Sequence, residues 1–528
     1  MTYSKINSSA ATGTKNLYGD EISPFSGMCA ICIEGCNGLC EIGKSSYRGS
    51  EAIYPQPFGK VTAASQKDYP IDYSHFNIMG SASGAKGVEE DSDKAIFTNV
   101  NLETCIGKNK SLRLKLPFII AGLGSTDIAR NNWEGLAIGS AISGVILTIG
   151  ENVCGIDPRS EFDNKGKVVK SPELERRVNL YKEWQQDGYG GIVVQANVED
   201  TRFGVLEYAI EKLGVEIVEL KWGQGAKDIG GEIKINNLER AIEIKKRGYI
   251  VLPDPLDPDV QRAFHHGDFK EFERHSRIGM VNREDFLKSV EHLRKVGAKY
   301  IFLKTGAYRP SDLAKAIKYS SEAGIDLITI DGAGGGTGMS PWRMMNEWGI
   351  PTVYLQCLAY NYAKFLDEKG KYVPDMAIAG GFTLEDLIFK GLALGAPYFK
   401  AVAMARSPIT ACMVGKTLSE KIKNNDIPQA VKKYGSDIES IFVEATDLMK
   451  EFKEKFNNIP GSAIGLFSYF KRLEQGLKQL MCGARKFALN YIERSDLVAL
   501  TKEASEISGI PYVMELDREE AKAILEEN

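Results

Sequence analysis

Four cysteines lie within twelve residues near the start of the chain. Cys29, Cys32, Cys36 and Cys40 form a C-x2-C-x3-C-x3-C array in the stretch CAICIEGCNGLC. Thiolates at this spacing can converge on one metal centre, and a [4Fe–4S] cluster is held by four of them. Zinc held by four thiolates is the competing interpretation, although its cysteine pairs usually lie further apart. We therefore predict a [4Fe–4S] cluster, with zinc as the alternative.

A second feature is the glycine-rich stretch IDGAGGGTGMSP, residues 330–341, which follows the apolar run GIDLITI. Glycine at the exit of a buried strand weakens packing and raises the entropic cost of folding. A tight strand-to-helix turn is one explanation, because a single glycine-rich motif is weak evidence. The other is that a flat, anionic ligand lies against the bare backbone.

The exits of other expected strands carry similar residues. GLGSTD, GEN, KWGQGAK, KTG and AGG each follow or end an apolar run. In a parallel barrel the carboxyl ends of all strands converge on one face, where active sites lie. Glycine clustered at several converging ends favours the ligand interpretation over turn chemistry alone.

The elements that would position these residues are short apolar runs separated by segments of helical spacing. Nearly continuous apolar runs are typical of parallel strands covered on both faces. Eight of them predict a (β/α)8 TIM barrel, and a doubly wound open sheet rarely needs so many. The runs are residues 118–123, 144–150, 191–197, 216–223, 300–306, 326–332, 376–381 and 398–405, with a helix expected over 311–323.

The rest of the chain is organised around this barrel. We expect the barrel over residues 117–429, with a loop-rich insertion at 224–299 that holds three prolines close together. Insertions on a barrel usually lie over the active-site mouth. The other units are a flexible N-terminus (1–20), an N-terminal unit with the cysteine array (21–116) and a helical C-terminal extension (430–528).

Composition excludes several classes of partner. The net charge is −4 and 43% of residues are hydrophobic, which favours neither nucleic acid nor an anionic membrane as the main partner. No apolar run approaches the roughly 20 residues of a membrane-spanning helix. The first residues lack the apolar core of a signal peptide. We therefore expect a cytoplasmic protein.

Several motifs together resemble the FMN-binding synthase domain of the glutamate synthase family over residues 117–415. They are Arg202-Phe203-Gly204, KWGQGAKDIGG (221–231), Lys304 in FLKTG, DGAGGGTGMSP (331–341) and AGG (379–381). Their order and spacing agree with the family, and the pairing of GQGAK with GGTGMSP is specific.

The resemblance implies an FMN across the barrel mouth, with its phosphate in the loops after the last two strands. Backbone N–H groups at Gly380 and Gly381 would approach the phosphate oxygens, aided by the next helix N-terminus. Lys221 and Lys304 would hold negative charge on the reduced flavin or a substrate carboxylate, and a structural salt bridge is the alternative for each. The expected cofactor-binding residues are Gly122, Gly124, Ser125, Gln195, Lys221, Lys304, Gly335, Gly336, Thr337, Gly338, Gly380, Gly381, Ala401 and Arg406.

The sequence departs from the family in three ways. We expect no amidotransferase domain, so ammonia would be free or come from another subunit. Only Cys412 follows the last strand, where the family binds a three-iron cluster, so that cluster is expected to be absent. Val402 occupies a glycine position of the last phosphate loop and takes positive φ less easily. Lys400 or Arg406 would then supply charge.

These features predict an FMN and iron–sulfur oxidoreductase that passes hydride between reduced FMN and the imine of a 2-oxo acid. The first candidate is 2-iminoglutarate to glutamate, or the reverse. Electrons would enter at the cysteine cluster. The expected catalytic residues are Glu151, Lys304 and Lys227, and the expected substrate-binding residues are Gln224 and Lys227.

Three other functions remain open at this point. The same apparatus could act on another amino or keto acid, or the chain could be an electron-transfer subunit without a substrate of its own. A phosphate-binding barrel with a structural zinc would use no flavin. The expected partners are a small amino or keto acid and an electron donor such as a ferredoxin or a reductase subunit, with a homo-oligomer left open.

Overall fold

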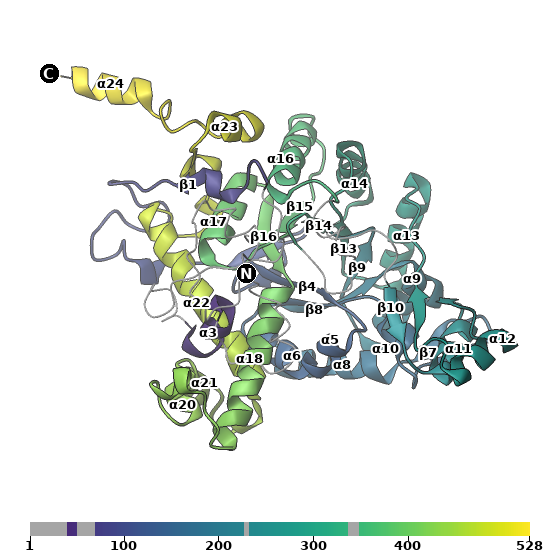
Figure 1. Ribbon diagram of the computed structural model, residues 1–528. Coiled ribbons are helices and arrows are strands. Elements are labelled where there is room, and N and C mark those ends of the chain that lie inside the picture. Colours follow the sequence, from purple (N-terminus) through teal and green to yellow (C-terminus); the bar gives the residue numbers. More distant parts are fainter. Residues whose placement is uncertain (1–39, 50–68, 226–231, 336–347, 528) are drawn as a thin grey trace.

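The computed structural model describes residues 40–49, 69–225, 232–335 and 348–527. Eight parallel strands close into a barrel in the order β13-β14-β15-β16-β4-β5-β8-β9 (Figure 1). This confirms the predicted TIM barrel. The strands are β4 (Phe118–Leu123), β5 (Ile146–Ile149), β8 (Gly191–Ala196), β9 (Ile217–Lys221), β13 (Tyr300–Thr305), β14 (Leu327–Asp331), β15 (Asp375–Ala379) and β16 (Phe399–Met404).

Helices alternate with these strands and cover the outside of the barrel. The helix expected over 311–323 is α14 (Pro310–Ala323), which has proline in its first turn and ends at Gly324 in the left-handed conformation. Both are favoured signals for helix ends. The other covering helices are α6 (Trp133–Ile142), α8 (Pro172–Trp184), α10 (Val205–Leu213), α13 (Arg283–Val296), α16 (Thr352–Glu368), α17 (Glu385–Gly395) and α18 (Arg406–Lys423).

A hairpin closes the amino end of the barrel. Its strands, β2 (Thr104–Ile106) and β3 (Leu112–Leu114), pair antiparallel. Ile106, Leu112 and Leu114 belong to the same apolar cluster as the residues that fill the barrel interior. The carboxyl end is therefore the end at which a ligand can approach.

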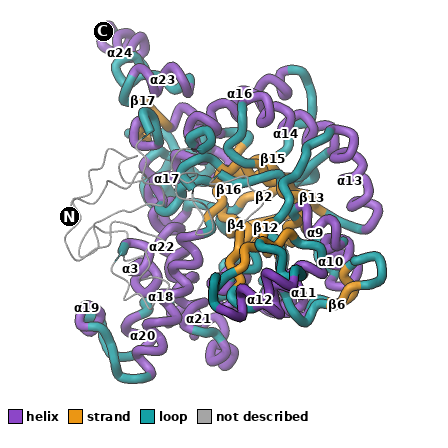
Figure 2. Tube along the Cα trace, turned by 45° about the vertical axis from the view of Figure 1, so that its right-hand side comes forward, coloured by secondary structure: helices purple, strands orange, loops and turns teal. Residues whose placement is uncertain are grey.

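The predicted loop-rich insertion contains regular structure. Strands β10 (Glu232–Ile235), β12 (Phe272–His275) and β11 (Ile250–Leu252) form an antiparallel sheet in that order. Helices α11 (Leu238–Lys246) and α12 (Pro258–His266) accompany it (Figure 2). The range 224–299 also includes α13, which packs against α10, α14 and β13 as a barrel helix does. We use "the insertion sheet" for β10, β11 and β12 together with helix α11 and the residues that join α11 to β11.

Segments from both ends of the chain pack on the barrel. Helix α22 (Gly461–Gly483) lies against α6, α18 and the short helix α3 (Glu41–Arg48). Strand β1 (Phe76–Ile78) pairs antiparallel with β17 (Leu497–Ala499). Helices α23 (Lys502–Ser508) and α24 (Arg518–Glu526) follow, and α24 projects away from the body (Figure 1). No helix in the described part of the chain is long and apolar enough to cross a membrane.

Candidate active site

The barrel interior changes from apolar to charged toward the carboxyl ends of four strands. Because strand side chains alternate in direction, the inward residues of β8, β9, β13 and β14 form layers. The deeper layers are apolar, with Val193, Ile217, Phe302 and Leu327 in one buried cluster. Above them on the same strand faces come Gln195, Glu219, Lys221, Lys304 and Asp331.

The other side of the mouth is lined by small residues. Ala379 on β15, Ala403 on β16 and Ala121 on β4 belong to the interior cluster and face inward. Gly122 leaves no room for any side chain, since a Cβ there would lie 2.7 Å from Oε1 of Gln195. The mouth is thus divided into a charged half and a half with little side-chain volume.

Two ion pairs organise the charged half. Lys304 Nζ lies 3.0 Å from Asp331 Oδ2, and both side chains are largely buried. Lys221 Nζ donates to Glu151 Oε1 at 2.7 Å and to Gln224 Oε1 at 2.9 Å. Gln195 donates to Glu219 Oε1, and both of these side chains are buried. The structural salt bridge expected as the alternative for each lysine is therefore present.

The charges set the protonation states. Burial raises the pKa of Glu151, but Lys221 and then Lys304 outweigh it and bring the pKa to about 2. Burial alone would lower the pKa of Lys304, yet Asp331, Glu219 and Glu151 hold it above the ordinary value. Glu219 has a raised pKa, mainly because it is buried. At neutral pH Glu151 is therefore an anion beside a cation, which favours binding a positive nitrogen over donating a proton.

Close backbone packing explains several of the glycines at the strand exits. A Cβ on Gly124 would lie 2.4 Å from Glu151 O, and one on Gly225 would lie 2.2 Å from Gly332 O. A Cβ on Gly380 would lie 2.7 Å from Gly332 O. Gly381 has no such close contact, since the nearest atom to a Cβ there, Gly334 O, is 3.6 Å away. Its φ of +105° is what favours glycine at this position. Neighbouring strand exits thus need glycine in order to pack closely on one another, whether or not a ligand binds there.

Other predicted site residues lie in different places. Arg406 begins α18, two residues after the end of β16, and is half-buried; desolvation lowers its pKa to about 10. Ala401 lies in the middle of β16 inside the barrel core, below the mouth. Lys400 neighbours Asp375 at the start of β15, so it lies at the opposite end and cannot supply charge at the exits. Seven predicted site residues lie outside the described residues: Lys227, Gly336, Thr337, Gly338, Cys29, Cys32 and Cys36.

Cys40 is the one member of the cysteine array that the structure describes. It is buried at the N-cap of α3, where its Sγ accepts a hydrogen bond from Gly43 N at 3.3 Å. Helix α3 packs against α18 and α22. The described residues hold no group of three or more His, Cys, Asp or Glu placed to bind a metal ion, and the array itself is mostly outside them.

Sequence reasoning missed Glu219 and Asp331, which complete the charged half. Asp331 stood in the quoted glycine-rich stretch. Glu219 could have been found as a carboxylate inside the apolar run EIVELKWG, two residues before Lys221 and thus on the same strand face.

Comparison with known proteins supports the sequence resemblance. Residues 273–416, which include β13 to β16 and their exits, match the family model described as the conserved region in glutamate synthase. The chain is similar to proteins named as glutamate synthases over part of its length. A glutamate synthase large subunit-like protein of Rhizobium meliloti is 24% identical over 432 residues, which are 78% of this chain and 81% of that protein.

Other relatives match over a shorter part. An archaeal glutamate synthase [NADPH] of Archaeoglobus fulgidus is 25% identical over 60% of this chain and 52% of its own length. This chain thus spans about half the length of that type of relative. A solved structure of a flavocytochrome b2 mutant with pyruvate bound covers 80% of this chain and 76% of its own at 13% identity and a TM-score of 0.45. A likeness of that size says nothing about chemistry.

Replacing Lys304 by methionine tests the pairing in the charged half. Removing one partner leaves Asp331 and Glu219 as buried carboxylates without that cation, which costs about 3–5 kcal/mol of unfolding free energy. The deficit shrinks as pH falls from about 7.5 to 5, because Glu219, whose pKa burial already raises, can then be protonated. Urea unfolding of the purified protein measures both effects.

Lys315→Met is the matched control, since Lys315 forms an exposed ion pair with Asp312 on α14. It leaves the urea midpoint nearly unchanged. Equal stability of the two variants would contradict the account.

Proposed function

We propose that the chain is an FMN-dependent oxidoreductase of the glutamate synthase type. It would transfer hydride between reduced FMN and the imine of a 2-oxo acid, with 2-iminoglutarate and glutamate as the first pair to test. The observation that carries this proposal is that the matched glutamate synthase region spans β13 to β16. That region contains Lys304, Asp331, Gly381 and Arg406, on both sides of the divided mouth.

The mouth offers what FMN would require. Ala121, Ala379 and Ala403 leave room for a flat ring on one side. Lys304 is a buried cation on the other side, suited to the negative charge of a reduced flavin. Gly381 and the half-buried Arg406, at the N-terminus of α18, are the residues that would hold the phosphate. Bound FMN would supply a hydride to the substrate and accept electrons one at a time.

The chain's own residues would bind and orient the substrate. Glu151, anionic at neutral pH, would hold the positively charged nitrogen of an iminium or amino group. Lys221, already bonded to Glu151 and Gln224, would face a carboxylate, with Lys227 as its expected neighbour. In the reductive direction a protonated imine held there would gain a hydride at carbon and keep the proton on nitrogen, which gives an amino acid.

The same chemistry on a different amino or keto acid is the second candidate. One observation favours it: the insertion sheet contacts the segment that carries Glu151, through Tyr249 and Arg247. An insertion at that place is suited to change the substrate that the mouth accepts.

The four cysteines would supply electrons to this site. We propose a [4Fe–4S] cluster on Cys29, Cys32, Cys36 and Cys40, reduced in the cytoplasm by a ferredoxin or a reductase subunit. Protein purified without oxygen is expected to carry about four iron and four sulfide per chain. Cys32→Ser and Cys36→Ser lose both, whereas Cys105→Ser, in β2, keeps both. One zinc per chain without sulfide would contradict the cluster.

Arg406→Met tests the flavin site. The wild-type protein is expected to release FMN on denaturation, and the apoprotein to bind FMN more tightly than riboflavin because only FMN carries a phosphate. In Arg406→Met the ratio of the two affinities falls about tenfold or more, the loss of one charge-assisted contact. Fluorescence titration of the apoprotein measures both affinities.

Arg262→Met is the control, because Arg262 is an exposed arginine on α12. A general loss of folding would weaken FMN and riboflavin alike, so it would not change the ratio. Absence of any flavin binding by the wild-type protein would contradict the proposed function.

A further inference from the structure

The segment that carries Glu151 has an unusual backbone. Glu151 follows β5, and Asn152 then adopts a left-handed conformation with φ of 67° while its side chain is buried. Non-glycine residues avoid this region unless surrounding contacts hold them there. The short helix α7 (Val153–Ile156) follows directly. The direction of Glu151 therefore depends on what fixes Asn152 and α7.

The barrel fixes Asn152 from one side through Asp200. Asp200 lies in α9 (Val198–Phe203), the helix that begins after β8, and is almost fully buried. Its Oδ2 accepts a hydrogen bond from the backbone N–H of Asn152 at 2.9 Å. The same oxygen accepts a longer one, 3.4 Å, from Asn197 N.

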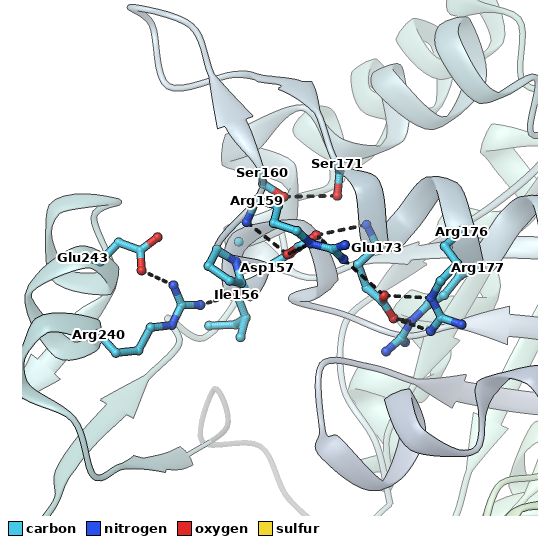
Figure 3. Close-up of polar contacts among 12 residues, drawn as sticks. Ile156, Asp157, Arg159, Ser160, Ser171, Glu173, Arg176, Arg177, Arg240 and Glu243 are labelled. Atoms are coloured by element: carbon cyan, nitrogen blue, oxygen red, sulfur yellow. Dashed lines mark hydrogen bonds and ion pairs between the residues drawn. The ribbon is translucent and has the colours of Figure 1, made fainter.

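The insertion sheet fixes the same segment from the other side. Tyr249, just before β11, donates from its hydroxyl to Asn152 Oδ1 at 3.2 Å. Arg247 Nη1 donates to the carbonyls of Gly155 and Asp157 at 2.9 and 2.7 Å. Arg240 of α11 donates to Ile156 O, and Figure 3 shows it reaching across to this carbonyl. Every one of these donors belongs to residues 240–249.

A buried charge cluster lies behind these contacts. Arg274 of β12 is buried, donates to Ser276 Oγ at 2.7 Å and lies over the ring of Tyr249. Neither Arg274 Nε nor Asp200 Oδ1 has a hydrogen-bond partner in the described part of the chain. Burial raises the pKa of Asp200 to about 7; the charge of Glu151 also raises it and Arg274 lowers it. Glu199, Tyr249 and Cys154 are further ionisable groups that interact electrostatically with Asp200, Arg274 or each other.

We propose that the insertion sheet clamps the Glu151 segment, with Asp200 and Tyr249 as positioning residues that set the place and electrostatic environment of Glu151 in the substrate site. The role assigned to Glu151 rests on the proposed function. The clamp itself does not, because it is a statement about which contacts hold residues 150–157.

The clamp has two consequences for binding. Loss of the Tyr249 hydroxyl removes the shorter of two hydrogen bonds to Asn152 Oδ1 and leaves the 3.5 Å one from Asn197 Nδ2. The Asn152 side chain is then held less firmly, so Glu151 meets the substrate nitrogen less often and KM rises more than kcat falls. Asp200 adds a negative charge beside Glu151 once it is deprotonated. Affinity for a cationic nitrogen therefore increases as pH rises through about 7, and Asp200→Asn removes that inflection.

Hydrogen–deuterium exchange of the full-length protein tests the clamp without any activity. Tyr249→Phe and Asp200→Asn are expected to speed exchange of the amides of residues 150–157 about tenfold or more, while the amides of β13 and β14 exchange as in the wild type. Tyr491→Phe and Asp268→Asn are controls, because both residues are exposed. Unchanged exchange at 150–157 in both variants would overturn the clamp, whatever the activity.

Steady-state kinetics with 2-oxoglutarate and ammonia then test the link to Glu151. Tyr249→Phe is expected to raise KM for ammonia about tenfold with kcat within about twofold. Asp200→Asn is expected to lose the inflection near neutral pH. Faster exchange with unchanged KM and pH profile would overturn the positioning role. If the wild-type protein shows no turnover at all, the proposed function fails, and the exchange result still decides the clamp.

Discussion

The structure depends on the need to pair charges where a closed barrel opens to its ligand. Lys304 is buried inside the barrel, and a lone lysine there would be strongly destabilising. Lys304 is tolerated because Asp331 on the next strand lies 3.0 Å away. Lys221 is tolerated because Glu151 and Gln224 surround it. The charged half of the mouth follows from these pairs, and so do the protonation states that make Glu151 an anion.

The same requirement explains the shape of the exits. The exits of β4 and β5 pack closely at Gly124, where a Cβ would lie 2.4 Å from Glu151 O. The insertion sheet and Asp200 then hold the segment behind Glu151. The small residues on β4, β15 and β16 give the opposite half of the mouth little side-chain volume. Charge pairing, close backbone packing and open volume thus meet at one end of one barrel.

Much of this arrangement could be predicted from the sequence. The eight apolar runs were recognisable because a strand covered on both faces must be apolar almost throughout, and Lys221 and Lys304 stood out against them. The insertion sheet could not be predicted, because β10 pairs with β12 across forty residues, as in Glu232 opposite His275, and no local pattern records such a pairing. Glycine spacing indicated converging exits, but it could not separate Gly225, where a Cβ would lie 2.2 Å from Gly332 O, from Gly381, where the nearest atom is 3.6 Å away. The pairing of Lys304 with Asp331 could not be predicted either, because it depends on which strands are neighbours in the barrel.

The chemistry proposed for this mouth is reduction of an imine with electrons held by a flavin. A single-turnover measurement tests it most directly: the anaerobically reduced protein is mixed with 2-oxoglutarate and ammonia, and the flavin absorbance is followed together with the glutamate formed. The account predicts that the flavin is reoxidised in step with one glutamate per flavin, and that neither 2-oxoglutarate nor ammonia alone does this. Reoxidation of the flavin only by a partner protein, with no response to any amino or keto acid, would contradict it.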